Sequence, residues 1–91
     1  MNINQSPLFY RTIKKLKPQQ KRVLDREVIK IIHNLIIGVQ KKGALKSVIV
    51  YKFKIGRTQY LLAYRIKRNQ IELIMIGPHE NYYKDLKRYL S

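Results

Sequence analysis

The chain has no cysteine, and this absence removes two common ways of stabilising a small domain. Neither a disulfide nor a zinc site built on thiolates is available to its 91 residues. That length is near the lower end of chains that bury an adequate core without such help. We therefore expect one domain, spanning residues 1–91, whose stability comes from packing or from a partner.

The sequence also lacks a long apolar run. Its most apolar segment, VIKIIHNLIIGV, is interrupted by Lys30, His33 and Asn34 and is too short to cross a bilayer. The first residues do not show the charged and then apolar order of a secretory signal peptide. We expect a soluble, cytoplasmic protein that does not enter a membrane.

Acidic residues are scarce: five Asp and Glu stand against twenty Lys and Arg, which gives a net charge of +15. The field of so basic a small protein favours polyanions such as nucleic acid or the ribosome, or an acidic protein. A charged surface that serves only solvation is the simpler alternative. The two histidines and the few carboxylates show no metal-ligand spacing, and there is no phosphate loop or nucleophile elbow. We expect neither a metal nor a cofactor.

The first half of the chain predicts two helices joined by a tight break. A Ser-Pro step at residues 6–7 is typical of a helix start, and a Lys-Pro step at residues 17–18 ends that helix. A second helix is expected over residues 18–37, with Gly38 as its left-handed stop. The two helices are expected to form an antiparallel hairpin. Residues 1–5 can form a short edge strand at best.

The second half predicts three strands and a last helix. Residues 48–55 and 60–66 alternate between two faces, whereas residues 71–76 are nearly all apolar, as in a strand covered on both sides. The short turns between these strands imply an antiparallel meander, and residues 81–90 return to helical spacing. The fold class is therefore α+β: an N-terminal helical hairpin on a twisted antiparallel sheet of three to four strands, with a C-terminal helix.

Alternation sorts the side chains of the first two strands onto two faces. The expected core row consists of Ile49, Tyr51, Phe53, Ile55, Tyr60, Leu62, Tyr64 and Ile66. The opposite face carries the cations Lys52, Lys54 and Arg65 and the apolar Val48, Val50, Leu61 and Ala63. Three cations on one side of a sheet suit a phosphate track, although strand lysines also protect sheet edges from aggregation. The apolar residues among them favour a binding surface, for a polyanion or for a protein partner.

Two segments resemble motifs of a known family. ELIMIGPHENYYKDL is a strand, then Gly-x-His, then a helix with aromatic residues, and TQYLLAYRI is similar to Gly-Asp-Tyr-Arg-hydrophobic-hydrophobic-Tyr-Arg-hydrophobic. In this order and size, with this charge, they resemble the RelE/ParE superfamily, the toxins of bacterial type II toxin–antitoxin systems, over nearly the whole chain.

The resemblance implies one partner and one of two activities. RelE-like members cut messenger RNA in the ribosomal A site, whereas ParE-like members poison DNA gyrase without being nucleases, and a cognate antitoxin silences both. RelE-like nucleases typically carry an arginine that holds the scissile phosphate at the position of Leu61. Arg65 matches the second arginine of the strand pattern, which is common to the superfamily.

The candidate catalytic residues follow the third strand. Cleavage of RNA by its 2′-hydroxyl needs a base, an acid and cations on the phosphate. His79 lies in a loop and has a side chain suited to acid–base work, and Glu80 beside it is a second candidate; the alternative is that both only cap the last helix. Tyr82 and Tyr83 are adjacent, so one is expected to anchor the helix and the other to reach substrate, where it can stack on an unpaired base. The spacing does not decide which of the two tyrosines anchors the helix.

These observations predict a ribosome-dependent mRNA endoribonuclease toxin. It is expected to use His79, with Glu80 or a tyrosine, over a face that binds RNA through Lys52, Lys54 and Arg65. The first alternative is a non-enzymatic gyrase poison, because Leu61 replaces the phosphate-holding arginine. The second alternative is an inactive relative that only binds nucleic acid.

Overall fold

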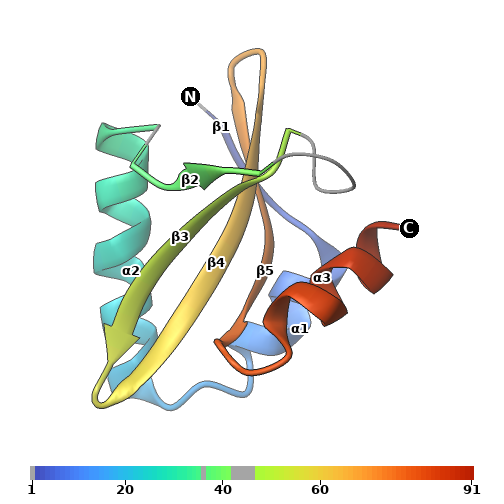
Figure 1. The fold of residues 1–91 in the computed structure, drawn as a ribbon. Helices are drawn as coiled ribbons and strands as arrows, with labels where there is room; N and C mark the ends of the chain where they lie inside the picture. The colour runs from blue at the N-terminus through green and yellow to red at the C-terminus, as the bar shows by residue number, and fades with distance from the viewer. Residues whose placement is uncertain (1, 36, 42–46) are drawn as a thin grey trace.

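The computed structural model describes residues 2–35, 37–41 and 47–91, which form five strands and three helices (Figure 1). In chain order these are β1 (Asn2–Gln5), α1 (Pro7–Ile13), α2 (Pro18–His33), β2 (Val39–Gln40), β3 (Ile49–Ile55), β4 (Thr58–Lys67), β5 (Gln70–Pro78) and α3 (Tyr82–Leu90). The α+β class predicted from the sequence is confirmed. Within the described residues, no helix is both long enough and apolar enough to span a membrane.

The strands form one mixed sheet in the order β1-β5-β4-β3-β2. The predicted antiparallel meander is present, because β3 pairs with β4 and β4 pairs with β5 in antiparallel fashion. β1 adds a parallel edge strand beside β5, and the two-residue β2 pairs with β3. The sheet therefore has five strands and not the three to four that were predicted. The prediction fell short because the two edge strands are too short to show a repeating pattern.

The path between α2 and the sheet differs from the prediction. α2 ends at His33, with Asn34 as its C-cap, before the predicted end at residue 37. Gly38 lies against β3, where an added Cβ would be 2.7 Å from Cγ2 of Ile49 and 2.9 Å from the carbonyl oxygen of Val50. Glycine at this position therefore allows two backbones to approach closely and does not stop the helix.

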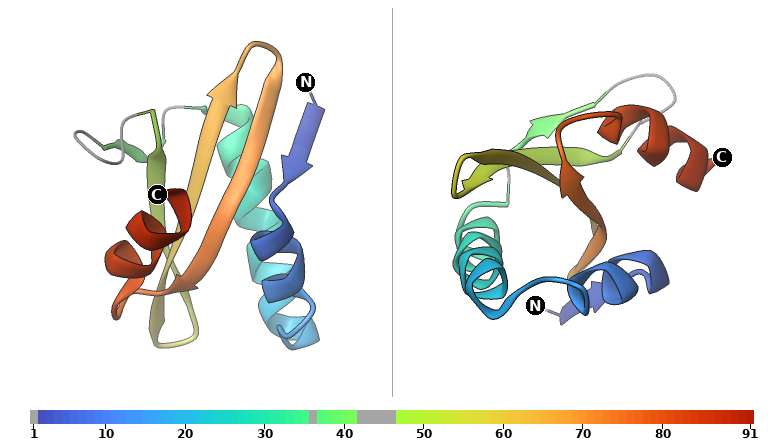
Figure 2. Two further views of the ribbon diagram at one scale, coloured as in Figure 1. Left: turned by 90° about the vertical axis from the view of Figure 1, so that its right-hand side faces the viewer. Right: turned by 90° about the horizontal axis from the view of Figure 1, so that it is seen from below.

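The two N-terminal helices diverge and do not form the tight hairpin predicted. α1 packs beside β5 and α2 packs against β3 (Figure 2). Ser6 starts α1 as expected, since its Oγ accepts a hydrogen bond from the Phe9 N–H at 3.0 Å. The same hydroxyl donates to the Ile74 carbonyl oxygen of β5. This double contact fastens the start of α1 to the sheet.

The face of the sheet toward α2 holds the main core. Phe9 of α1 and Leu24 and Ile31 of α2 are buried there against the strands. The predicted core row is found in this cluster: Ile49, Tyr51, Phe53, Ile55, Tyr60, Leu62, Tyr64 and Ile66. Period-two alternation therefore gave the correct faces of β3 and β4.

The opposite face is covered by α3 (Figure 2). Its apolar residues Val48, Val50, Leu61 and Ala63 are each at most 2% exposed. Tyr82 and Leu86 of α3 pack on them. The prediction of an apolar binding surface at this place is therefore wrong, because the apolar stripe of the last helix and the apolar patch of the sheet bury each other.

Tyr82 anchors α3 to the sheet. Its side chain is 2% exposed, and its hydroxyl donates a hydrogen bond of 2.6 Å to the Met75 carbonyl oxygen of β5. Burial raises the pKa of this phenol far above its ordinary value, so the hydroxyl stays protonated as a donor.

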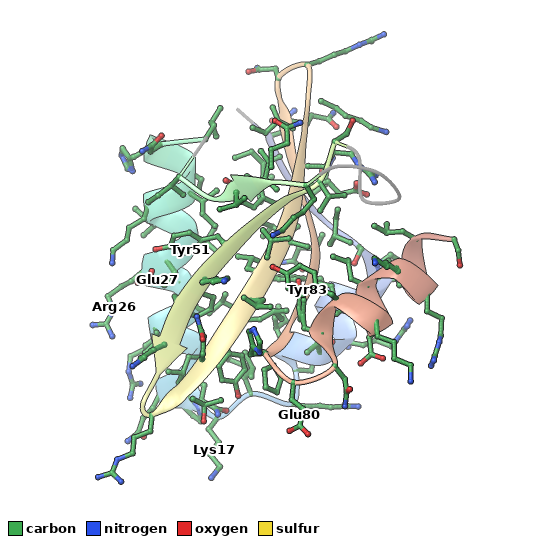
Figure 3. The ribbon with its side chains drawn as sticks, in the orientation of Figure 1. Lys17, Arg26, Glu27, Tyr51, Glu80 and Tyr83 are labelled. Carbon is green, nitrogen blue, oxygen red and sulfur yellow. The ribbon has the colours of Figure 1, made fainter. Side chains whose placement is uncertain are left out.

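A polar contact joins α2 to β3 on the other face. The Tyr51 hydroxyl donates to the Glu27 carboxylate, and Nζ of Lys30 lies 3.0 Å from the same carboxylate (Figure 3). Burial and the bond to Glu27 raise the pKa of Tyr51 to about 12. Burial alone raises the pKa of Glu27, but the bonds from Tyr51 and Lys30 outweigh it and hold that pKa below its ordinary value.

Glu27→Gln should therefore destabilise the fold in a pH-dependent way. Because the folded-state pKa of Glu27 is below 4.5, its stabilising effect is present above that pH and is lost as the pH falls through the folded value. We expect the free energy of unfolding to drop by about 1–3 kcal/mol at pH 7 and by less at pH 3, measured by urea denaturation. Asp25→Asn, at an exposed carboxylate of the same helix, is the control. Equal losses at both pH values would contradict the assignment.

Tyr82→Phe should lower the free energy of unfolding by about 1–2 kcal/mol, because it leaves the buried Met75 carbonyl oxygen without its donor. Urea denaturation measures the change, and Tyr89→Phe on the exposed side of α3 is the matched control. If both variants are as stable as the wild type, the hydroxyl of Tyr82 is not part of the anchor.

Candidate functional site

Two lysines of β3 and a histidine that follows β5 lie toward the same end of the sheet. In the register of the strands, Lys54 lies opposite Gln59, and the Gln59 carbonyl oxygen accepts a hydrogen bond of 2.9 Å from the backbone N–H of His79. With neighbouring strands about 4.8 Å apart, the Cα atoms of Lys54 and His79 are about 10 Å apart across β4. Lys52 lies two residues before Lys54 on β3, opposite Leu61. We call Lys52, Lys54 and His79 the strand-end cluster.

The end of β5 fixes the position of His79. The strand leaves the sheet after Pro78, and Asn81, with a φ of 59°, turns the chain into α3. The Tyr82 N–H donates to the His79 carbonyl oxygen at 3.2 Å. The backbone of His79 is therefore bonded on both sides, to β4 and to the start of α3, while its imidazole is exposed.

The lysines of the cluster are exposed. Among the described residues, the ion pairs are Lys30 with Glu27 and Arg65 with Glu72. Lys52 and Lys54 thus have no carboxylate partner in that part of the chain. Two exposed ammonium groups without a carboxylate partner in the described residues attract an anion such as a phosphate.

Arg65 is on the predicted face but is not part of the strand-end cluster. It is four residues beyond Leu61 on β4, a distance of about 13 Å along the strand. Its Nη1 is 3.3 Å from Oε1 of Glu72 on the neighbouring strand. The structure therefore separates Arg65 from the two lysines with which the sequence grouped it.

Leu61 is completely buried under α3. It lies between Lys52 of β3 and Gly77 of β5 in the register. This is the position at which the resemblance to RelE-like nucleases leads one to expect an arginine. Here it supplies an apolar contact to α3, and positive charge at this end of the sheet comes from lysines.

The adjacent tyrosines take different positions. Tyr82 is the buried anchor, so its hydroxyl does not reach a substrate. Tyr83 is half-buried, and its ring meets that of Tyr82 in a T-shaped arrangement, with centroids 5.8 Å apart and planes at 89°. The Tyr83 side chain extends from the start of α3 over the sheet (Figure 3). Tyr83 is thus the tyrosine of this pair that a ligand can contact.

Glu80 is adjacent to His79 in sequence but lies on the β5 side of the molecule. It is exposed and helps to line a shallow groove between α1, the end of β5 and α3, together with Thr12, Pro78 and Asp85. Its carboxylate points away from the sheet in Figure 3. Unlike His79, whose backbone N–H is bonded to Gln59 of β4, Glu80 is thus directed toward this groove.

Lys41 is a neighbour of Tyr83 that the sequence gave no reason to select. It follows β2, and its backbone N–H donates to the Val48 carbonyl oxygen at 2.8 Å. Its Nζ lies 4.8 Å from the centroid of the Tyr83 ring. The pairing of β2 with β3, which has no sequence signature, places Lys41 on the side of the sheet where α3 carries Tyr83.

The arrangement suits acid–base work on a bound anion. An imidazole can accept or donate a proton, two ammonium groups can neutralise a phosphate, and a phenol can stack or donate a proton. No three His, Asp or Glu side chains of the described residues are grouped as metal ligands.

Solved structures share this fold. A chain of the intact Escherichia coli RelBE toxin–antitoxin complex matches with a TM-score of 0.68 and 17% identity, over 87% of this chain and 96% of that chain. The isolated E. coli RelE toxin matches with a TM-score of 0.66 and 18% identity, over 97% of both chains. At these identities the likeness concerns the fold.

The sequence itself gives the family. No curated protein sequence matches the chain, but the model of the family described as ParE-like toxin of type II bacterial toxin-antitoxin system matches residues 3–87. That match covers nearly the whole chain, including the strand-end cluster, Tyr82 and Tyr83. The chain therefore belongs to the ParE-like toxins of type II bacterial toxin–antitoxin systems, whose partners are antitoxins.

Proposed function

We propose that this toxin is a ribosome-dependent endoribonuclease that cuts messenger RNA in the cytoplasm and so inhibits translation. The observation that carries the proposal is the strand-end cluster, in which His79, held by its backbone and with its imidazole exposed, lies at the same end of the sheet as two lysines that have no carboxylate partner among the described residues. The net charge of +15 supports binding to the ribosome and its message.

The residues of the strand-end cluster and Tyr83 have distinct roles in this reaction. Lys52 and Lys54 bind the scissile phosphate and stabilise the charge that grows on its oxygens. The neutral imidazole of His79 takes the proton of the 2′-hydroxyl, and the 2′-oxygen then attacks the phosphorus. Tyr83 donates a proton to the 5′-oxygen as its bond to phosphorus breaks. The products are a 2′,3′-cyclic phosphate and a 5′-hydroxyl end, and solvent restores the protonation states of His79 and Tyr83.

Three residues predicted from the sequence have no role in this proposal. Tyr82 is buried and its hydroxyl is bonded to Met75. Arg65 is paired with Glu72 and lies about 13 Å from Leu61 along β4. Glu80 is on the β5 side of the sheet, in the groove beside α1.

His79→Ala should lower cleavage of translated messages by about 100-fold or more, because general acid–base groups contribute about that much. Primer extension after induction measures cleavage as new 5′ ends, and growth should recover in the variant. His33→Ala is the matched control, since His33 is the other histidine and is exposed at the end of α2. A growth arrest by the wild type without any new 5′ ends would remove the proposal.

Poisoning of DNA gyrase without RNA cleavage is the second candidate. The observation that favours it is the buried Leu61, which leaves the sheet without the arginine expected of RelE-like nucleases. In this case a growth arrest is accompanied by gyrase-linked DNA cleavage and an SOS response.

The two candidates make opposite predictions for one variant. A gyrase poison should stay toxic when His79 is replaced by alanine, because no proton transfer is involved, whereas an endoribonuclease should not. Colony counts after induction, with supercoiling of a reporter plasmid as a second measurement, separate them. Normal supercoiling and no DNA damage during arrest would dispose of the gyrase candidate.

A further inference from the structure

We infer that Lys41 is a positioning residue for Tyr83 in the proposed cleavage reaction. Nζ of Lys41 lies 4.8 Å from the centroid of the Tyr83 ring, which is within the range of a cation–π contact. The inference rests on the proposed function and adds to it a residue that does not itself meet the reacting atoms.

The backbone of Lys41 is held in place by the sheet. Val39 of β2 pairs with Val50 of β3, and the N–H of Lys41 donates to the Val48 carbonyl oxygen at 2.8 Å. The side chain is half-buried. Because the start of the side chain is fixed, less conformational entropy is lost when its ammonium group is held over a ring.

The Tyr83 ring is supported from a second direction. It meets the Tyr82 ring at a centroid distance of 5.8 Å, and Tyr82 is itself fixed by its bond to the Met75 carbonyl oxygen. The ring of Tyr83 thus lies between a buried aromatic neighbour and a cation from the sheet edge. Two such contacts restrict its side-chain rotamer, and so the place of its hydroxyl.

This arrangement favours one use of Tyr83 over another. A base cannot stack on the face of the ring that Lys41 covers, so that contact competes with base stacking. It does not compete with proton donation by the hydroxyl, which lies in the plane of the ring. Positioning for proton donation therefore agrees with the geometry better than stacking does.

The test uses purified toxin and ribosomes programmed with a message of defined codon in the A site. Cleavage is followed at increasing ribosome concentration for the wild type, K41M, K41R, Y83F and K41M/Y83F. Lys14→Met is the matched control, because Nζ of Lys14 lies 4.2 Å from the centroid of the Tyr10 ring on α1. Thermal unfolding of each variant checks that it folds.

K41M should lower the maximal cleavage rate by about 5- to 30-fold, the factor expected from the loss of one cation–π contact. The half-saturating ribosome concentration should change by less than about twofold, and K41R should recover most of the rate because arginine also binds aromatic rings. In the Y83F background, K41M should have no further effect, because there is no hydroxyl left to position. K14M should cleave like the wild type.

Several results would overturn the inference while leaving the proposed function intact. One is cleavage by K41M at the wild-type rate. Another is a K41M defect that persists undiminished in the Y83F background, or that appears only as a higher half-saturating concentration, because Lys41 then contacts RNA directly. If the wild-type toxin itself does not cut the message, the proposed function fails and the inference fails with it.

Discussion

The burial of the second face of the sheet under α3 is the constraint on which the rest of the structure depends. The strands are apolar on both faces, and without α3 the side chains around Leu61 would be exposed to water. The helix is fixed there by Tyr82, whose hydroxyl reaches the Met75 carbonyl oxygen. Once Tyr82 is in the core, its neighbour Tyr83 is placed at the rim and His79 in the connection before the helix.

The same constraint decides where charge can occur on that face. α3 covers its middle, and among the described residues Lys52 and Lys54 lie toward one end of this face and Arg65 toward the other. Arg65 is half-buried and is compensated by Glu72, whereas the lysines are exposed and lie at the same end of the sheet as His79. The cations that the sequence pattern assigns to one face of the sheet therefore lie in two separate electrostatic environments in the fold.

Much of this could be predicted because it follows from local repeats. Alternation gave the faces of β3 and β4, and the apolar run of residues 71–76 gave the middle of β5, which extends from Gln70 to Pro78. The parts that could not be predicted depend on contacts between distant segments. The pairing of β1 with β5, the close approach of Gly38 to β3 and the meeting of Lys41 with Tyr83 have no periodic signal. Glu80 adjoins His79 in sequence, but it helps to line the groove beside α1 and α3, and sequence adjacency at a strand end does not give this direction.

The replacement of arginine by a buried leucine bears on why the proposed reaction would need the ribosome. A guanidinium group binds a phosphate in a fixed, bidentate geometry, whereas an ammonium group is a point charge on a flexible stem. Lys52 and Lys54 therefore supply attraction but little orientation. An in-line attack by the 2′-oxygen requires both. If the toxin does not orient the message, the surface that holds the codon in the A site has to, so free RNA would be bound by charge but rarely held in a reactive geometry.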